Sequence, residues 1–525
     1  MFLNRTAAGS ATMLVLSALT IVHAQTPTGD EADLAHRIQE LQTRLETQQT
    51  QIKVQQGQLA DLQAQLEALR ATSKPGVQDS PRWTFTNGRP AISSSDGRNS
   101  LSVRALVQGD LGHYTQDPVG PLGVDYRRGS IGSSGNRENN GARDLGDGFN
   151  FRRARLGVEG VIARDFSYRF VAELGGAGTE GPTRINDAWL AYNGFAPISM
   201  QIGAFAPPAN LEDSTSPEDQ LFLERASSAE LSRALAGADG RLGIGVRATG
   251  SRWFGALTLT GRTVNDAEVF DSQTAVVGRG AALLAGSEDF TFQLGLSGSY
   301  VIHPPDSGAD APGARHGIRF RDRPELRIDG TRLIDTGTID ADHAYAAGVE
   351  WVARWRSLLL QGESFWFGIE RARPTTLSDP RFSGYYLEGS WVLTGEPHRY
   401  NAATAAMQNP RPRATFSSSG GWGAWELALR YSHVDLNHHA GDPGVFATAD
   451  AVRGGVQDIL TFGLNWYLNA NIRFLFDYSR VRIDRLNPAG DGTPAPFGIA
   501  PLTPPAGVQT GQEFNSYALR SQFSF

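Results

Sequence analysis

The sequence predicts an all-β transmembrane barrel of about 16 antiparallel strands, preceded by an N-terminal α-helical coiled coil. Three observations predict this architecture. The chain begins with an export signal, it continues with a heptad repeat over residues 31–72, and from residue 100 to Phe525 it shows recurring segments in which apolar and polar residues alternate. Together they describe an exported chain with one helical part and one part that crosses a membrane with strands.

Composition excludes several classes of site and partner. The 525 residues include no cysteine, which excludes disulfides, thiolate metal sites and cysteine nucleophiles. The formal net charge of −7 gives no reason to expect a nucleic-acid partner. Lys53 and Lys74 are the only lysines, so every later cation is arginine or histidine. Arginine keeps its charge and offers a planar fork of donors, whereas lysine acts as a point charge.

Residues 1–24 have the features of a secretory signal peptide. Arg5 precedes an apolar run from Ala11 to Val22, and the small residue Ala24 completes a cleavage site before Gln25. No later run approaches the roughly 18 to 20 apolar residues of a membrane helix. The mature chain is therefore either soluble or a membrane β-barrel.

Residues 31–72 repeat apolar residues at alternating spacings of four and three. One core position of the heptad holds Ile38, Leu45, Ile52, Leu59 and Leu66, and the other holds Leu34, Leu41, Gln48, Gln55, Leu62 and Leu69. This period predicts a coiled coil and hence self-association, since a lone helix would leave the stripe in water. The pattern leaves open whether two or three chains assemble. Residues 73–99, with breakers such as Pro75 and Gly76, are predicted to be a linker.

Residues 100–525 are predicted to form the barrel. In "GAWELALRYSHV" the residues Trp425, Leu427, Leu429 and Tyr431 share one face, while Glu426 and Arg430 lie on the other. Similar segments end near Trp or Tyr, and short connections such as "LNAN" alternate with long polar ones such as 125–148, 304–316 and 396–419. A soluble sandwich does not predict this alternation of connections, and an outer-membrane barrel does. At roughly 25 residues per strand with its loops, the segment accommodates about 16 strands and a water-filled pore.

The C-terminal "YALRSQFSF" alternates strictly, with Tyr517, Leu519, Phe523 and Phe525 on one parity. This predicts the closing strand of the barrel. A terminal aromatic is typical of the signal by which the barrel-assembly machinery recognises such strands. The predicted location is therefore the outer membrane of a Gram-negative bacterium, with the barrel in contact with outer-membrane lipid and the coiled coil in the periplasm.

Six stretches carry a family resemblance: residues 151–160, 318–337, 383–400, 423–436, 461–481 and the final "QFSF". From about Asn150 to Phe525 the chain resembles the phosphate- and pyrophosphate-selective porins, often called porins O and P. The resemblance implies a porin-like trimeric barrel of 16 strands with one inward-folded loop. It also implies passive uptake of small anions, phosphate being the name-giving substrate. A homotrimer would suit the N-terminal coiled coil.

An arginine row supplies the candidate selectivity residues. Arg315, Arg319, Arg321, Arg323 and Arg327 all have odd numbers, so in an extended chain they would project to one side about 6.6 Å apart. Such a row is unfavourable unless an anion or a carboxylate neutralises it. The predicted lining of the anion path is Arg153, Arg155, Arg319, Arg321, Arg323 and Arg327. The alternative is that these arginines brace the wall by pairing with lumen glutamates, which are Glu159, Glu173, Glu350, Glu363, Glu388 and Glu426.

Residues 206–240 are the candidate constriction. Ser216 followed by Pro217 and Asp219 predicts a helix start, and Gly237 predicts the helix end. Acidic residues outnumber basic ones in this segment, and no lysine occurs anywhere in the barrel, although the resemblance implies lysines near the narrowest point. The sequence thus leaves three alternatives for the permeant, which are phosphate, a related anion and a different solute.

No catalytic, cofactor or metal site is predicted. Ser432 and His433 lie on opposite faces of one strand, so they do not form a nucleophile–base pair. The stretch "HVDLNHHAGD" offers His433, Asp435, His438, His439 and Asp442 to a metal, but histidines of an external loop are usually solvated. The predicted protein is a passive channel rather than an enzyme, and the alternative is a structural tether with a closed barrel.

Overall fold

The computed structural model describes residues 29–72, 80–86, 88–120, 124–127, 144–176, 183–266, 270–309, 314–488 and 505–525. The chain divides into two compact units, Met1–Asp79 and Ser80–Phe525. The predicted signal peptide, residues 1–24, lies outside the described residues.

The first unit contains one helix, α1 (Gly29–Thr72). Within residues 36–65, where the side chains are described, the predicted heptad core is exposed in the single chain, with Leu45 and Leu59 each 58 % accessible. The helix is confirmed, and the coiled coil stays a prediction that the exposed stripe favours. Among the described residues no helix combines the length and apolar character needed to cross a membrane.

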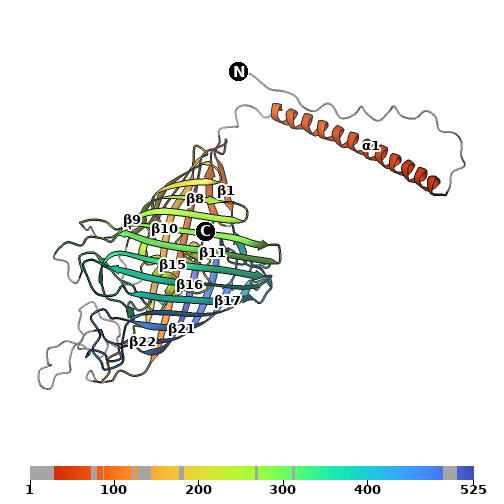
Figure 1. Ribbon diagram of the computed structural model, residues 1–525. Coiled ribbons are helices and arrows are strands. Elements are labelled where there is room, and N and C mark those ends of the chain that lie inside the picture. Colours follow the sequence, from red (N-terminus) through yellow and green to blue (C-terminus); the bar gives the residue numbers. More distant parts are fainter. Residues whose placement is uncertain are drawn as a thin grey trace, which may run out of the picture. The chain divides into compact units, whose positions relative to one another are not determined.

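The second unit is a closed antiparallel barrel (Figure 1). The described residues form its sixteen strands: β3 (Ser100–Gln116), β4 (Gly148–Ile162), β5 (Phe166–Glu173), β6 (Arg184–Phe195), β7 (Ile198–Phe205), β8 (Arg241–Thr249), β9 (Trp253–Thr263), β10 (Thr274–Gly286), β11 (Phe290–His303), β15 (Ile339–Trp355), β16 (Leu358–Arg371), β17 (Arg381–Val392), β20 (Ala424–His438), β21 (Val452–Tyr467), β22 (Ile472–Asp484) and β23 (Glu513–Ser524). The terminal strand β23 pairs with β3, which closes the sheet and confirms the predicted architecture.

Shorter elements extend the barrel or fold against it. They are β1 (Arg82–Thr86), β2 (Arg89–Ser93), β12 (Gly317–Ile318), β13 (Arg321–Asp322), β14 (Ile334–Asp335), β18 (Arg399–Asn401), β19 (Ala406–Gln408), α2 (Leu211–Ser214) and α3 (Ser227–Ala236). The hairpin of β1 and β2 occupies part of the predicted linker 73–99, and β2 pairs with β3. The sheet therefore begins before residue 100.

The outer surface of the barrel is apolar between two belts of aromatic residues. Near the short turns, Trp425 stacks on Trp466 of the neighbouring strand with ring centroids 5.0 Å apart. Farther along the strands, Tyr385 lies 6.1 Å from Tyr431. Exposed leucines such as Leu429 lie between the belts. This surface is what a lipid bilayer covers.

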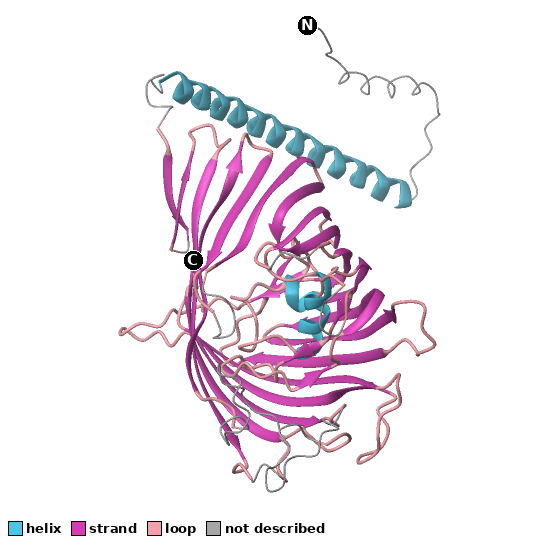
Figure 2. Ribbon diagram, turned by 90° about the vertical axis from the view of Figure 1, so that its left-hand side faces the viewer, coloured by secondary structure: helices cyan, strands magenta, loops and turns pink. Residues whose placement is uncertain are grey.

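One side of the barrel interior is a dry core rather than a wet lumen. Inward-facing apolar residues of β11, β16, β20 and β22 belong to a single buried cluster that includes Val301, Phe365, Val434 and Leu475, and α3 packs against the first three of these strands. Figure 2 shows the short helix enclosed by strands. These residues would be unfavourable against water, and the helix removes them from it. The open volume is left beside β3 to β9.

The predicted helix start at Ser216 is wrong, and the predicted end at Gly237 is confirmed. Residues 206–240 form two helices, α2, with Asn210 as its N-cap, and α3, which ends at Gly237. The chain between them is held by wall side chains instead of helical hydrogen bonds. Leu223 N donates to Asp477 Oδ2, and Asn465 Nδ2 donates to the carbonyl of Leu221. Those wall partners are distant in sequence, so the local pattern did not reveal them.

The connection between β17 and β20, residues 393–423, is a long one at the end of the barrel where other turns are short. The neighbouring connections 356–357 and 468–471 illustrate the usual length at this end. The prediction that 396–419 is one of the long loops of the opposite end is therefore wrong. The segment carries the hairpin of β18 and β19 and folds back into the barrel.

Candidate functional site

Two segments enter the barrel from opposite ends and meet inside it. We call them the inner loop (residues 206–240) and the inner turn (residues 393–423). Asn409 of the inner turn donates from its backbone N to Asp219 Oδ1 (3.0 Å) and from Nδ2 to the carbonyl of Glu218 (2.6 Å). These contacts join the two segments into one partition across the lumen.

The inner loop is anchored by buried charge. Glu224 contacts Arg152 at 2.7 Å, Arg520 at 2.9 Å and Arg327 at 3.3 Å. Burial opposes ionisation of this carboxyl, but the guanidinium groups of Arg152 and Arg520 hold the pKa of Glu224 well below its usual range. Arg233 pairs with Asp213 and Asp239 in the same way. Much of the acidic excess seen in the sequence is therefore neutralised locally.

The inner turn is anchored to the opposite wall. Arg279, itself paired with Glu350 at 2.7 Å, donates to the carbonyls of Thr404 and Ala405, each at 2.7 Å. Tyr400 Oη donates to Gln293 Oε1 at 2.8 Å. These contacts place the hairpin against β10 and β11, where it narrows the lumen.

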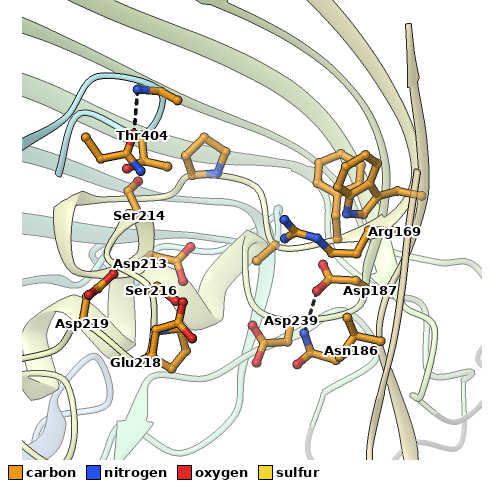
Figure 3. A pocket seen from close by; sticks show the side chains of 18 of the residues that line it. Arg169, Asn186, Asp187, Asp213, Ser214, Ser216, Glu218, Asp219, Asp239 and Thr404 are labelled. Carbon is orange, nitrogen blue, oxygen red and sulfur yellow. Dashed lines mark hydrogen bonds between the residues drawn. The ribbon is translucent and has the colours of Figure 1, made fainter. Parts of the chain in front are cut away.

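A first cavity of about 450 Å³ lies between the partition and the wall of β3 to β9. Figure 3 shows Arg169, Asp187 and Asp239 on one side and Asp213, Glu218 and Asp219 on the other. The charged lining is balanced, with five arginines and five acids: Arg104, Arg155, Arg169, Arg225 and Arg247 against Asp187, Asp213, Glu218, Asp219 and Asp239. The Arg169 guanidinium also lies 5.3 Å from the ring centroid of Trp189.

A second cavity of about 340 Å³ lies at the short-turn end and is strongly basic. Its charged side chains are Arg89, Arg104, Arg399, Arg411 and Arg473 against Glu218 and Asp219. The two cavities share Arg104 and Glu218, whose charged atoms are 3.9 Å apart. A solute that moves between the cavities therefore passes this pair.

The electrostatics of the shared boundary favour anions more than a simple count of charges suggests. Burial and the neighbouring carboxylate of Glu218 raise the pKa of Asp219 to about 6, so its negative charge begins to be lost just below neutral pH. Within the described residues, four lining arginines have no carboxylate within 4 Å: Arg247, Arg399, Arg411 and Arg473. These cations can attract a passing anion without first breaking an ion pair.

The six arginines predicted from the sequence fall in different surroundings. Arg155 lines the first cavity and pairs with Glu173 (2.7 Å) and Asp239 (2.6 Å). Arg153 is buried beside it and donates to Gln108 Oε1 at 2.6 Å. Arg327 contacts Glu230 at 2.8 Å on the inner loop. The structure thus brings Arg153 and Arg155 close to the lumen, as residues two positions apart on β4.

The remaining three, Arg319, Arg321 and Arg323, do not form one continuous row. Arg319 and Arg321 are exposed, and Arg319 pairs with Asp335, whereas Arg323 is buried. Between residues 319 and 327 only Arg321–Asp322 is a strand, and Glu325, with φ of 61°, turns the chain out of the extended conformation soon after it. The prediction that these arginines form a row required an extended chain. The chain does not stay extended here.

The arginines that line the second cavity were not among the residues predicted from the sequence. Arg473 could have been found, because it lies on the polar parity of an alternating strand. Arg399 and Arg411 carried no such signal, since they lie in the inner turn, whose position depends on contacts with distant strands.

The chain is similar in sequence to known proteins. The family described as "Phosphate-selective porin O and P" matches residues 128–494. Porin O of Pseudomonas aeruginosa is 24 % identical over 397 residues, covering 71 % of this chain and 84 % of that protein. An uncharacterized protein of Caulobacter vibrioides is 26 % identical over 415 residues, covering 77 % and 73 %.

Among solved structures, an anion-selective porin from Comamonas acidovorans aligns with a TM-score of 0.46 at 13 % identity, covering 81 % of this chain and 100 % of that one. OmpT of Vibrio cholerae aligns with a TM-score of 0.44 at 9 % identity, covering 82 % and 98 %. The family match over most of the chain, together with a closed sixteen-stranded barrel, shows that this chain belongs to the phosphate-selective porin O and P family and is an outer-membrane porin.

Proposed function

We propose that the protein is a passive diffusion channel that prefers small anions. The observation that carries this proposal is the set of lining arginines without carboxylate partners, Arg247 in the first cavity and Arg399, Arg411 and Arg473 in the second. Charged side chains along a narrow, water-filled path lower the barrier for ions of opposite charge. Arginine can also contact phosphate oxygens with two parallel hydrogen bonds, so the lack of lysine does not exclude phosphate.

The proposed path enters at the long-loop end and leaves through the second cavity. Short turns face the periplasm in outer-membrane barrels, so the basic second cavity would open there. Of the residues predicted from the sequence, we assign Arg155 to this path and Arg321 to the outer mouth. We assign a bracing role to Arg153, Arg319, Arg323 and Arg327, because none of them lines either cavity and each is buried or paired with an acid.

Replacing Arg247, Arg399 and Arg411 with glutamine should lower the anion-over-cation permeability ratio several-fold. Each change removes an attraction of about 1 kcal/mol for an ion 4 Å away in water-like surroundings. The measurement is the reversal potential of purified protein in a planar bilayer with a KCl gradient. The matched control replaces Arg319, Arg321 and Arg323, and it should change the ratio much less. An unchanged ratio in the first variant would exclude the proposed path.

Titration with phosphate in the same bilayer identifies the permeant. Block of KCl conductance at low phosphate concentration supports a phosphate-binding porin. Anion preference without block supports an anion channel whose substrate is an anion other than phosphate. No conductance at all favours a structural tether.

A second candidate substrate class follows from the balanced charge of the first cavity. Arg169 of the wall lies across it from Asp213, Glu218 and Asp219 of the inner loop, which would suit a small solute carrying both charges (Figure 3). Liposome swelling with a zwitterion and a monoanion of equal size compares the two classes. Faster entry of the zwitterion would favour this candidate.

We also propose that α1 forms a trimeric coiled coil in the periplasm. Replacing Leu45 and Leu59 with aspartate should lower the temperature at which the oligomer dissociates, because both side chains occupy the heptad core. The control replaces Thr50 and Ala64, which lie on the opposite side of the heptad, with aspartate. Light scattering of the detergent-solubilised protein measures both. Equal dissociation temperatures in the two variants would exclude the coiled coil.

A further inference from the structure

Two histidines and an aspartate meet at the long-loop end of the barrel, away from the lumen. His438 is the last residue of β20, His439 follows it, and Asp450 lies near the end of the connection to β21, two residues before that strand begins. One ligand atom of each residue lies within 4.8 Å of the others. His439 is 57 % exposed at its side chain, so an ion in the medium can reach the cluster.

The backbone turns both imidazoles to the same side. Consecutive residues of a strand normally point to opposite faces. His439 instead has φ of 48°, in the left-handed region that residues other than glycine seldom adopt. As a result the two rings stack with centroids 4.0 Å apart. Two adjacent histidines are thereby placed as a pair of nitrogen donors.

The surrounding contacts hold the carboxylate in position. Asp450 Oδ2 accepts from Ser378 Oγ (2.6 Å) and lies 2.8 Å from His439 Nδ1, while Thr448 Oγ1 donates to Oδ1 (2.8 Å). Ser378 Oγ is also 2.8 Å from His438 Nε2, so this hydroxyl links the second imidazole to the carboxylate. Since its proton goes to Asp450, Ser378 is not arranged as a nucleophile activated by His438.

We propose that His438, His439 and Asp450 bind one zinc ion or a similar transition-metal ion, with water or Ser378 as a fourth ligand. Two imidazole nitrogens and one carboxylate oxygen are a donor set that zinc accepts in tetrahedral geometry. Calcium and magnesium need more oxygen ligands than the cluster offers. Arg371 donates to the carbonyls of Ser378 and Asp450. Its positive charge further disfavours calcium and magnesium, which bind mainly through electrostatic attraction. With Ser378 as the fourth ligand, the ion would join the connections 372–380 and 439–451.

The test is calorimetric titration of the purified, chelator-treated, full-length protein in detergent with ZnCl₂. We expect one zinc ion per chain and a loss of affinity of at least about 100-fold in the H438A/H439A double variant. The matched control is His113→Ala, which removes an exposed histidine that pairs with one carboxylate, Asp147, at 2.6 Å. This control should bind zinc like the unchanged protein, and CaCl₂ should give no saturable binding.

Two further measurements test the proposal even if the double variant misfolds. Asp450→Asn keeps both imidazoles and should weaken zinc binding by roughly tenfold or more. Cobalt bound by the unchanged protein should give the visible absorption of a tetrahedral site, and this absorption should be absent from the double variant. Saturable zinc binding of equal affinity in the unchanged protein and the double variant would overturn the proposal, as would no binding by the unchanged protein.

Discussion

Replacing Arg520 with alanine is expected to destabilise the barrel by about 3–5 kcal/mol, the range for breaking a buried ion pair. Arg520 lies on the closing strand β23 and is fully buried. It contacts Asp110 of β3 at 2.6 Å and Glu224 of the inner loop at 2.9 Å, and it also donates to the carbonyl of Leu223. The variant would leave two carboxylates in a dry site with one fewer cation. Barrel closure and the position of the inner loop therefore depend on the same guanidinium.

The loss of stability is measured by urea unfolding, followed by the heat-modifiable mobility of the barrel on a gel. Release of the inner loop is measured by single-channel recording, in which it should appear as a larger and noisier conductance. The matched control is Arg480→Ala on the neighbouring strand, where the partner Glu513 is half exposed. Exposed pairs contribute about 0–1 kcal/mol, so this control should be nearly neutral. Similar unfolding midpoints in the two variants would show that Arg520 does not couple the closing strand to the loop.

Replacing residues 395–423 of the inner turn with Asn-Gly should raise the single-channel conductance several-fold. The ends of β17 and β20 are already adjacent, since Leu393 N donates to the carbonyl of Trp425 at 2.7 Å, and Asn-Gly is a suitable two-residue hairpin turn. The deletion removes the hairpin that packs on Arg279 and Gln293 and half of the partition across the lumen. Conductance rises because a larger cross-section of water remains.

The variant needs one compensating change. His398 of the inner turn contacts Glu426 at 2.6 Å in a buried pair, so Glu426→Gln should accompany the deletion. Glu426→Gln alone, with the inner turn intact, is the control and should keep the original conductance. If the deletion also left conductance unchanged, the inner loop alone would limit the path. The anion preference of the shortened protein should fall as well, since Arg399 and Arg411 are removed with the turn.

Alternation along the chain was sufficient to predict the barrel. Segments such as that around Trp425 predicted strands with one apolar face, and their spacing predicted sixteen of them. The last residues predicted the closing strand, and β23 pairs with β3 as expected. These features are local or periodic, because a strand in a membrane barrel must present apolar residues to lipid at every second position. The family resemblance likewise depended on short contiguous stretches.

The sequence by itself thus determined the fold, the helix before it and the family, whereas the tertiary structure decided which charges face open water. Arg327 looked like a lining residue until Glu224 and Glu230 were found beside it. Arg399 became a candidate only because the inner turn folds back into the lumen. The physical reason is that neutralisation of a charge depends on partners far away in the sequence, as between Arg520 and Asp110, and no local period encodes such a pair.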